Sequence, residues 1–177
     1  QRLQSFDFKS FMRLFQSHID FYDLYSVRVL NLRISVLNYW RTKAGEIEWV
    51  YITVGEPFTV PNLIEVCDTL TEAGFKVGVT TNGTFFKPEV ADHVNRIGIS
   101  IDGRKEYHDA YRGEGVYDSA IKLFKAVRQK CETVIMSVAF KENLEELKLL
   151  EPIINDLDPT YWQVQRDIND ANLNIPL

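Results

Sequence analysis

The chain has 177 residues, a formal net charge of −5 and a composition that is 45% hydrophobic and 25% charged. These values are ordinary for one globular domain with a sizeable core, and they exclude a disordered or fibrous protein. The negative charge and the lack of any dense Lys/Arg run argue against a nucleic-acid partner, while a ligand of nucleotide size stays compatible with them. No apolar run approaches membrane-spanning length, so we predict no membrane partner and a cytoplasmic location.

The amino-terminal part of the chain changes its pattern twice. Within an N-terminal helical region at residues 1–25, aromatic and aliphatic side chains recur at helical spacing from Ser5 to Tyr25. Leu30 to Val36 then alternates apolar and polar residues, which favours a strand, although a helix face also fits. After a polar connector, the apolar, β-branched run from Glu48 to Val54 predicts a buried strand.

From there on, predicted helices and strands alternate. Helices are predicted from Pro61 to Gly74, Lys87 to Asn95 and Asp118 to Gln129, and from Asn143 onward, where Glu146 completes a capping box. Strands are predicted at Phe75–Thr81, Arg96–Ile101, Val134–Phe140 and Tyr161–Gln165, before a C-terminal extension at 166–177. This alternation predicts an α/β fold with parallel strands and right-handed crossovers in a single domain over residues 1–177. Five or six strands are too few for a closed eight-stranded barrel, which leaves a partial barrel or a doubly wound sheet.

Polar residues follow three successive predicted strands. These strands end in Gly55-Glu56-Pro57, Thr81-Asn82-Gly83 and Ser100-Ile101-Asp102-Gly103. The carboxyl ends of parallel strands meet at one edge, so we expect these groups to converge there. Carboxylates, an amide and hydroxyls suit a ligand that carries an ammonium and a ribose. Asn-Gly and Asp-Gly are also common turn formers, but three such ends in register favour a site.

Two further sets of residues are candidates for the same region. Four residues after the Asp102-Gly103 turn are candidates to line a pocket mouth: Tyr107, His108, Tyr111 and Arg112. Arg112 suits either a ligand carboxylate or a surface ion pair with Glu114. Three residues at the end of the last strand are candidate substrate contacts: Gln163, Gln165 and Arg166.

The strand-end motifs together resemble those of a known family. The order Gly-Glu-Pro, Thr-Asn-Gly-Thr and Ile-Ser-Ile-Asp-Gly, followed by Tyr107-His108-Asp109 and Arg112-Gly113-Glu114-Gly115, closely resembles the radical S-adenosylmethionine superfamily, nearest its peptide- and protein-modifying (SPASM-type) branch. The resemblance implies a partial (β/α)6 TIM-like barrel with S-adenosylmethionine as a small-molecule cofactor. The family's Gly-Gly-Glu motif maps onto Val54-Gly55-Glu56, which implies that Gly55 and Glu56 hold the methionine amino group.

The same resemblance implies roles for other residues and for the whole chain. Ser100 and Asp102, together with Asn82, would contact the nucleoside. The implied activity is generation of a 5′-deoxyadenosyl radical that abstracts hydrogen from a peptide or small-molecule substrate. A peptide or protein partner is also implied.

The iron–sulfur motif of the family is missing. Its members hold a [4Fe–4S] cluster on CxxxCxxC, whereas this chain has two distant cysteines, Cys67 and Cys131, which are more typical of inert thiols. In one explanation Leu30, Ile34 and Leu37 occupy the three cysteine positions of a degenerate motif. In the other, the cluster loop precedes Gln1. Both explanations remain open.

Three functional hypotheses follow. The first is a radical S-adenosylmethionine enzyme core. The second is a non-catalytic binding or partner protein on the same scaffold, which the missing cysteines favour. The third, a nucleotide-binding α/β domain of another kind, is weakened because the sequence has no Gly-rich phosphate loop.

Overall fold

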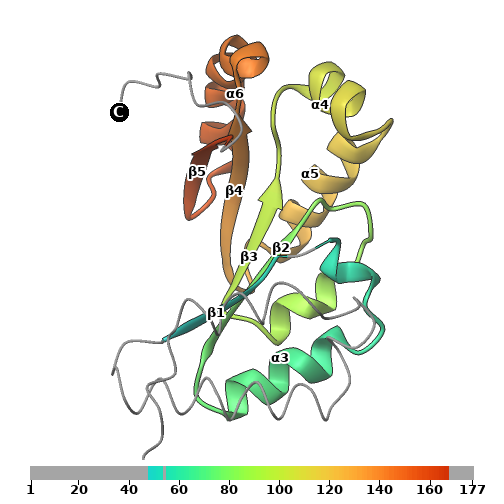
Figure 1. Ribbon diagram of the computed structural model, residues 1–177, viewed down its shortest axis with the longest axis vertical. Coiled ribbons are helices and arrows are strands. Elements are labelled where there is room, and N and C mark those ends of the chain that lie inside the picture. The colour runs from blue at the N-terminus through green and yellow to red at the C-terminus, as the bar shows by residue number, and fades with distance from the viewer. Residues whose placement is uncertain (1–47, 54, 168–177) are drawn as a thin grey trace, which may run out of the picture. The chain divides into compact units, whose positions relative to one another are not determined.

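The described part of the chain is a parallel sheet with helices. The computed structural model describes residues 48–53 and 55–167, which all belong to one compact unit, Glu46–Leu177 (Figure 1). The strands are β1 (Trp49–Ile52), β2 (Lys76–Thr81), β3 (Arg96–Ser100), β4 (Glu132–Ala139) and β5 (Tyr161–Arg166). The described strands pair in parallel in the order β1-β2-β3-β4-β5.

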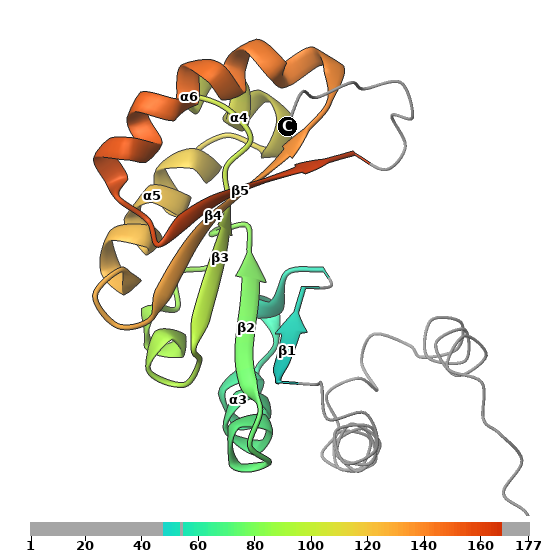
Figure 2. The same ribbon diagram turned by 90° about the vertical axis from the view of Figure 1, so that its left-hand side faces the viewer.

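Helices connect these strands. They are α3 (Leu63–Glu72), α4 (Lys105–Arg112), α5 (Val116–Val127) and α6 (Leu144–Leu157), with short 3₁₀ turns at Pro57–Thr59, Pro88–Asp92 and Lys141–Asn143. A sheet whose strands follow one another in chain order, with right-handed crossovers, places all its helices on one face. Figure 2 shows α5 and α6 together on one side of the sheet. The other face, which we call the concave face, carries no helix among the described residues.

The core lies between the sheet and its helices. On α3 the buried residues Leu63, Val66, Cys67 and Leu70 recur at helical spacing and form one apolar side. Buried strand residues face the helices at alternate positions: Val77, Val79, Ile97, Ile99 and Ile135. The apolar patterns that predicted these elements therefore reflect burial against a single layer of helices.

Several predicted elements are confirmed with shifted ends. The parallel α/β fold is confirmed, and the five strands predicted from Glu48 onward correspond to β1 to β5. The first of them, β1, was predicted to be buried but is half-exposed. The predicted helix from Pro61 to Gly74 is α3, and Gly74 follows it with a left-handed φ of 85°, a conformation that glycine adopts at low cost. Arg166, which was assigned to the C-terminal extension, belongs to β5.

Two local predictions are wrong, and one helix was not predicted. Lys87–Asn95 is not an α-helix but contains the short 3₁₀ turn Pro88–Asp92. Helix α4 was not predicted, because it is a short and mostly polar segment of eight residues that buries only His108. The capping box at Asn143 does not form, since Asn143 Oδ1 accepts a hydrogen bond from Phe140 N instead, at 2.9 Å.

Some predictions fall on residues that are not described. The N-terminal helix at 1–25, the strand at Leu30–Val36 and residues 168–177 of the extension lie outside the described residues. The sixth strand of a partial barrel and the single domain over 1–177 therefore stay predictions. Among the described residues, none of the helices combines the length and the apolar character that a membrane span requires.

Candidate functional site

Glu56 joins the carboxyl ends of β1 and β2. It precedes the 3₁₀ turn Pro57–Thr59, and its Oε1 accepts hydrogen bonds from Phe58 N at 2.9 Å and from Thr81 Oγ1 at 2.7 Å. Its Oε2 accepts a hydrogen bond from Asn82 N at 2.7 Å. The structure thus brings together Glu56 and Asn82, which are 26 positions apart in the sequence.

The half-buried Glu56 carboxylate has acceptor capacity left. An ionised carboxylate offers about four acceptor positions, and three hydrogen bonds from described residues occupy it here. Gly55 next to it is exposed and has a left-handed φ of 67°, so the backbone turns here with no side chain in the way. This end of β1 therefore suits an ammonium group better than an anion.

Asn82 and Ser100 lie at the ends of the next two strands. Asn82 is half-buried, and its Oδ1 accepts a hydrogen bond from Thr84 N at 2.9 Å, which leaves its amide nitrogen without a partner among the described residues. Gly83 behind it has a φ of 78°, and a Cβ there would come within 2.7 Å of the Ala120 backbone, so only glycine fits. Ser100 is half-buried at the end of β3, where alternation from Arg96 places it on the concave face.

Asp102 is fully buried, and each of its polar groups has a partner within the protein. Its N–H donates to His108 Nδ1 at 3.1 Å, and its carbonyl accepts from Asn143 Nδ2 at 3.1 Å. Its Oδ1 accepts from Val138 N at 2.8 Å, and its Oδ2 accepts from Arg112 Nε at 2.5 Å. Asp102 therefore ties the end of β3 to α4, to β4 and to the turn before α6.

Two residues that were expected at a pocket mouth support Asp102 instead. His108 is fully buried, and its Nδ1 accepts a hydrogen bond, so the proton of the neutral ring is on Nε2, which has no partner among the described residues. Burial lowers the pKa of His108, opposed by the nearby Asp102 carboxylate. Arg112 pairs with Asp102 and not with Glu114. By contrast, Tyr111 is 62% exposed.

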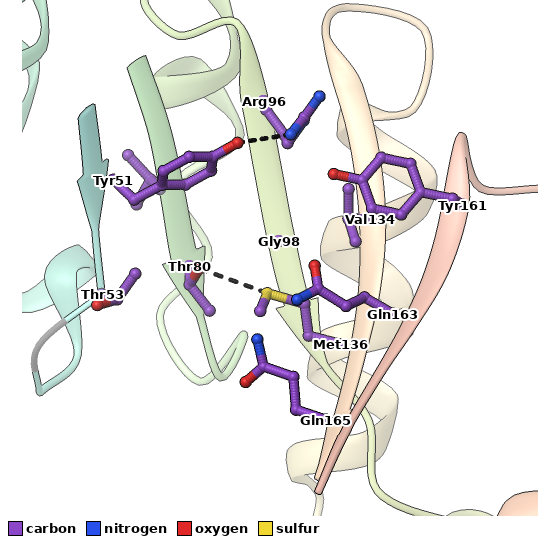
Figure 3. Close-up of a pocket in the computed structure, with 11 residues that line it drawn as sticks. Tyr51, Thr53, Thr80, Arg96, Gly98, Val134, Met136, Tyr161, Gln163 and Gln165 are labelled. Carbon is purple, nitrogen blue, oxygen red and sulfur yellow. Dashed lines mark hydrogen bonds between the residues drawn. The ribbon is translucent and has the colours of Figure 1, made fainter. Parts of the chain in front are cut away.

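A cavity of about 330 Å³ lies on the concave face (Figure 3). Residues of all five described strands, mostly at alternate positions, line it together with Thr53, which follows β1: Tyr51, Val79, Thr80, Arg96, Gly98, Val134, Met136, Tyr161, Gln163 and Gln165. Two of the sheet's glycines provide its space: a Cβ on Gly78 would come within 2.5 Å of the Tyr51 ring, and one on Gly98 would come within 2.5 Å of Met136 Sδ. Glycine at these two positions lets larger neighbours lie flat across the sheet.

The described residues do not fit an iron–sulfur cluster. A [4Fe–4S] cluster of this kind needs three thiolates, and the sequence contains only two cysteines. Cys67 is fully buried on α3, and burial raises the pKa of its thiol to about 12, while burial raises the pKa of Cys131 to about 11. No group of three or more His, Cys, Asp or Glu side chains suited to a metal occurs among the described residues. Leu30, Ile34 and Leu37 lie outside the described residues.

Comparison with known proteins identifies the family of this chain. A family model described as the radical SAM superfamily matches residues 21–152. The AdoMet-dependent heme synthase of Methanosarcina barkeri is 31% identical over 118 residues, which cover 62% of this chain and 34% of that protein. The subtilosin biosynthesis protein AlbA of Bacillus subtilis is 33% identical over 116 residues, covering 60% of this chain and 26% of that protein.

A solved structure shares the fold. SuiB of Streptococcus suis superimposes with a TM-score of 0.64 at 19% identity, over 77% of this chain and 33% of that protein, and it has also been solved with S-adenosylmethionine and with the precursor peptide SuiA. At this identity the likeness concerns the fold alone. The chain spans between about a quarter and a third of the length of these proteins. Because the family model covers most of the chain, the protein belongs to the radical SAM superfamily.

Proposed function

We propose that this domain binds S-adenosylmethionine at the carboxyl edge of its sheet and takes part in radical hydrogen abstraction. The observation that carries the proposal is Glu56, whose carboxylate is fixed by three hydrogen bonds and keeps acceptor capacity at a strand end. A carboxylate held in this way pairs with the ammonium of the methionine moiety without having to be ordered first. Gly55 leaves the adjacent backbone open to the same group.

The nucleoside would lie along the next two strand ends. Asn82 offers an amide nitrogen that has no partner among the described residues, and Ser100 offers a hydroxyl on the concave face. Asp102, the other residue expected at the ribose, would act by holding Ser100 and the end of β3 in place, because its own oxygens are bonded to Val138 and Arg112. Bound there, S-adenosylmethionine would supply the 5′-deoxyadenosyl radical after one-electron reductive cleavage of its C–S bond, and the electron would have to come from a [4Fe–4S] cluster that the described residues do not hold.

The second candidate function is binding without catalysis. The observation that favours it is the cysteine content: two cysteines with raised thiol pKa values cannot hold a cluster by themselves. In this case the carboxyl edge would retain S-adenosylmethionine or a partner without cleaving the cofactor. The names of the relatives point to two product classes, the bacteriocin subtilosin for AlbA and heme for the Methanosarcina enzyme.

Calorimetric titration with S-adenosylmethionine tests the binding step. We expect Glu56→Gln to lower the affinity about tenfold or more, because an amide cannot replace a charge-assisted hydrogen bond to an ammonium. Glu72→Gln, an exposed carboxylate at the end of α3, is the matched control and should leave the affinity unchanged. Thermal unfolding of both variants separates lost binding from lost structure. An unchanged affinity in Glu56→Gln would show that the cofactor does not bind at this edge.

Anaerobic reconstitution with iron and sulfide separates catalysis from binding alone. The chain and a Leu30→Cys, Ile34→Cys, Leu37→Cys variant would each be followed by absorbance and by release of 5′-deoxyadenosine. Activity in the triple variant alone would identify a degenerate cluster motif at these positions. Activity in neither would favour the binding function or a cluster loop that lies elsewhere.

A further inference from the structure

The positive charge that lines the concave-face cavity is already paired with a carboxylate of the protein. Arg96 is the one charged side chain among the described residues that line the cavity. Its Nε and Nη2 donate to Glu132 Oε2 at 2.8 and 2.6 Å, and its Nη1 donates to Tyr51 OH at 2.6 Å. Its guanidinium also lies over the rings of Trp49 at 4.3 Å and Tyr161 at 5.2 Å. Three of the five N–H donors of Arg96 are therefore engaged within the protein, and its positive charge is paired with the Glu132 carboxylate.

The remainder of the lining is neutral and polar. Gln163 and Gln165 extend from β5 toward Met136 in the middle of the sheet (Figure 3). Neither amide has a hydrogen-bond partner among the described residues, although each offers two donors and an acceptor. Thr80 Oγ1 contacts Met136 Sδ at 3.5 Å and completes a floor of hydroxyl and thioether groups. Met136 adds an adaptable apolar surface.

The spacing of the two glutamines matches an extended peptide. Residues two apart on a strand project from the same face and lie roughly 6.6 Å apart, since the rise is about 3.3 Å per residue. An extended peptide presents backbone amides of like orientation at the same repeat. Gln163 and Gln165 therefore suit two such amides of one chain that runs alongside β5.

We propose that this cavity binds an uncharged, amide-rich segment of a peptide, with Gln163 and Gln165 pairing with its amides, and that it rejects polycarboxylates. The proposal rests on the proposed function, because it names the substrate class of the same domain. A ligand with several carboxylates would lose its hydration in a cavity whose one cation is already paired. A neutral amide would instead meet glutamine donors and acceptors that have no partner among residues 48–53 and 55–167.

Nuclear magnetic resonance titration of the whole chain, without S-adenosylmethionine, tests this proposal. The probes are the blocked peptide N-acetyl-Asn-Gly-Asn-N-methylamide, its Asp-Gly-Asp counterpart of nearly equal shape, and the tetracarboxylate coproporphyrin III. We expect saturable binding of the Asn peptide, with shifts of the Gln163 and Gln165 side-chain amides, and at least tenfold weaker binding of both carboxylates. Tighter binding of either carboxylate probe, or no saturable binding of the Asn peptide, would overturn the proposal.

Charge-reversing variants locate the contact. Gln163→Glu and Gln165→Glu keep the side-chain shape but replace a donor by an anion, so we expect each to weaken the Asn peptide about tenfold. Gln129→Glu, which adds the same charge in the exposed turn after α5, should change binding less than twofold. Equal effects at all three positions would contradict the proposed contact. Because the titration omits the cofactor, peptide binding and S-adenosylmethionine binding can fail independently of each other.

Discussion

Glu56 and Asp102 occupy similar places in the sequence but different environments in the fold. Both are carboxylates that follow a parallel strand, and both precede a turn. Glu56 is half-buried and keeps acceptor capacity, whereas Asp102 is fully buried and has a protein partner for its N–H, its carbonyl and each carboxylate oxygen. A strand-end carboxylate can therefore bind a ligand or stabilise the fold. The number of its hydrogen-bonding groups that have a partner within the protein distinguishes these two roles.

The largest expected effect is on stability at Asp102. Asp102→Ala would leave the Arg112 guanidinium without its carboxylate and the Val138 N–H without an acceptor, so we expect it to lower the free energy of unfolding by about 3–5 kcal/mol. Urea denaturation measures this change. Asp156→Ala, at an exposed carboxylate of α6, should stay within about 0.5 kcal/mol. A similar small loss at both positions would contradict a scaffold role for Asp102.

Glu56 should show a smaller loss of stability. Glu56→Ala removes the acceptor of three hydrogen bonds, from Phe58 N, Thr81 Oγ1 and Asn82 N, but water can reach part of this edge. We expect the free energy of unfolding to fall by about 1–3 kcal/mol in the same urea experiment. A loss as large as that of Asp102→Ala would place both carboxylates in the scaffold and would weaken the proposed cofactor contact.

The sequence predicts the fold better than it predicts whether a given residue binds a ligand or stabilises the structure. The strands β2 and β3 are apolar runs bounded by Gly74, Asn82, Asn95 and Asp102, and β4 contains a run of buried apolar residues, so local patterns suffice to find these strands. The convergence of Glu56 and Asn82 also follows, because parallel strands must end at one edge. Periodicity does not reveal whether the carboxylate of Asp102 faces solvent or the interior.

Helix α4 shows why that information is missing. Its eight residues are mostly polar, and the helix is held by the contacts of His108 and Arg112 with Asp102 rather than by an apolar stripe. Such contacts depend on residues that are six and ten positions apart and on β4, so no local pattern contains them. The concave-face glycines Gly78 and Gly98 were missed for the same reason, since the side chains that need their space come from neighbouring strands.

The smallest expected effect is a pH dependence that His108 adds to the Asp102 network. Burial lowers the pKa of the folded-state ring below its unfolded value of about 6.5, with Asp102 and Asp109 opposing that shift and Arg112 reinforcing it. The unfolded chain therefore binds the proton first as the pH falls below about 6.5. Stability is fully present above that pH and declines toward the lower folded-state pKa, with a slope of at most about 1.4 kcal/mol per pH unit.

Urea denaturation at several pH values between 5 and 7.5 measures that slope. Protonation of Nδ1 would also remove the acceptor for the Asp102 N–H, so the loss reports on the same network. His108→Gln should flatten the dependence, whereas His93→Gln, at a half-buried histidine that contacts Asp68 at 2.7 Å, should leave it in place. If His108→Gln retained the full slope, another group would be responsible. The network around Asp102 would then be held by its carboxylate contacts with Arg112 and Val138 rather than by the histidine.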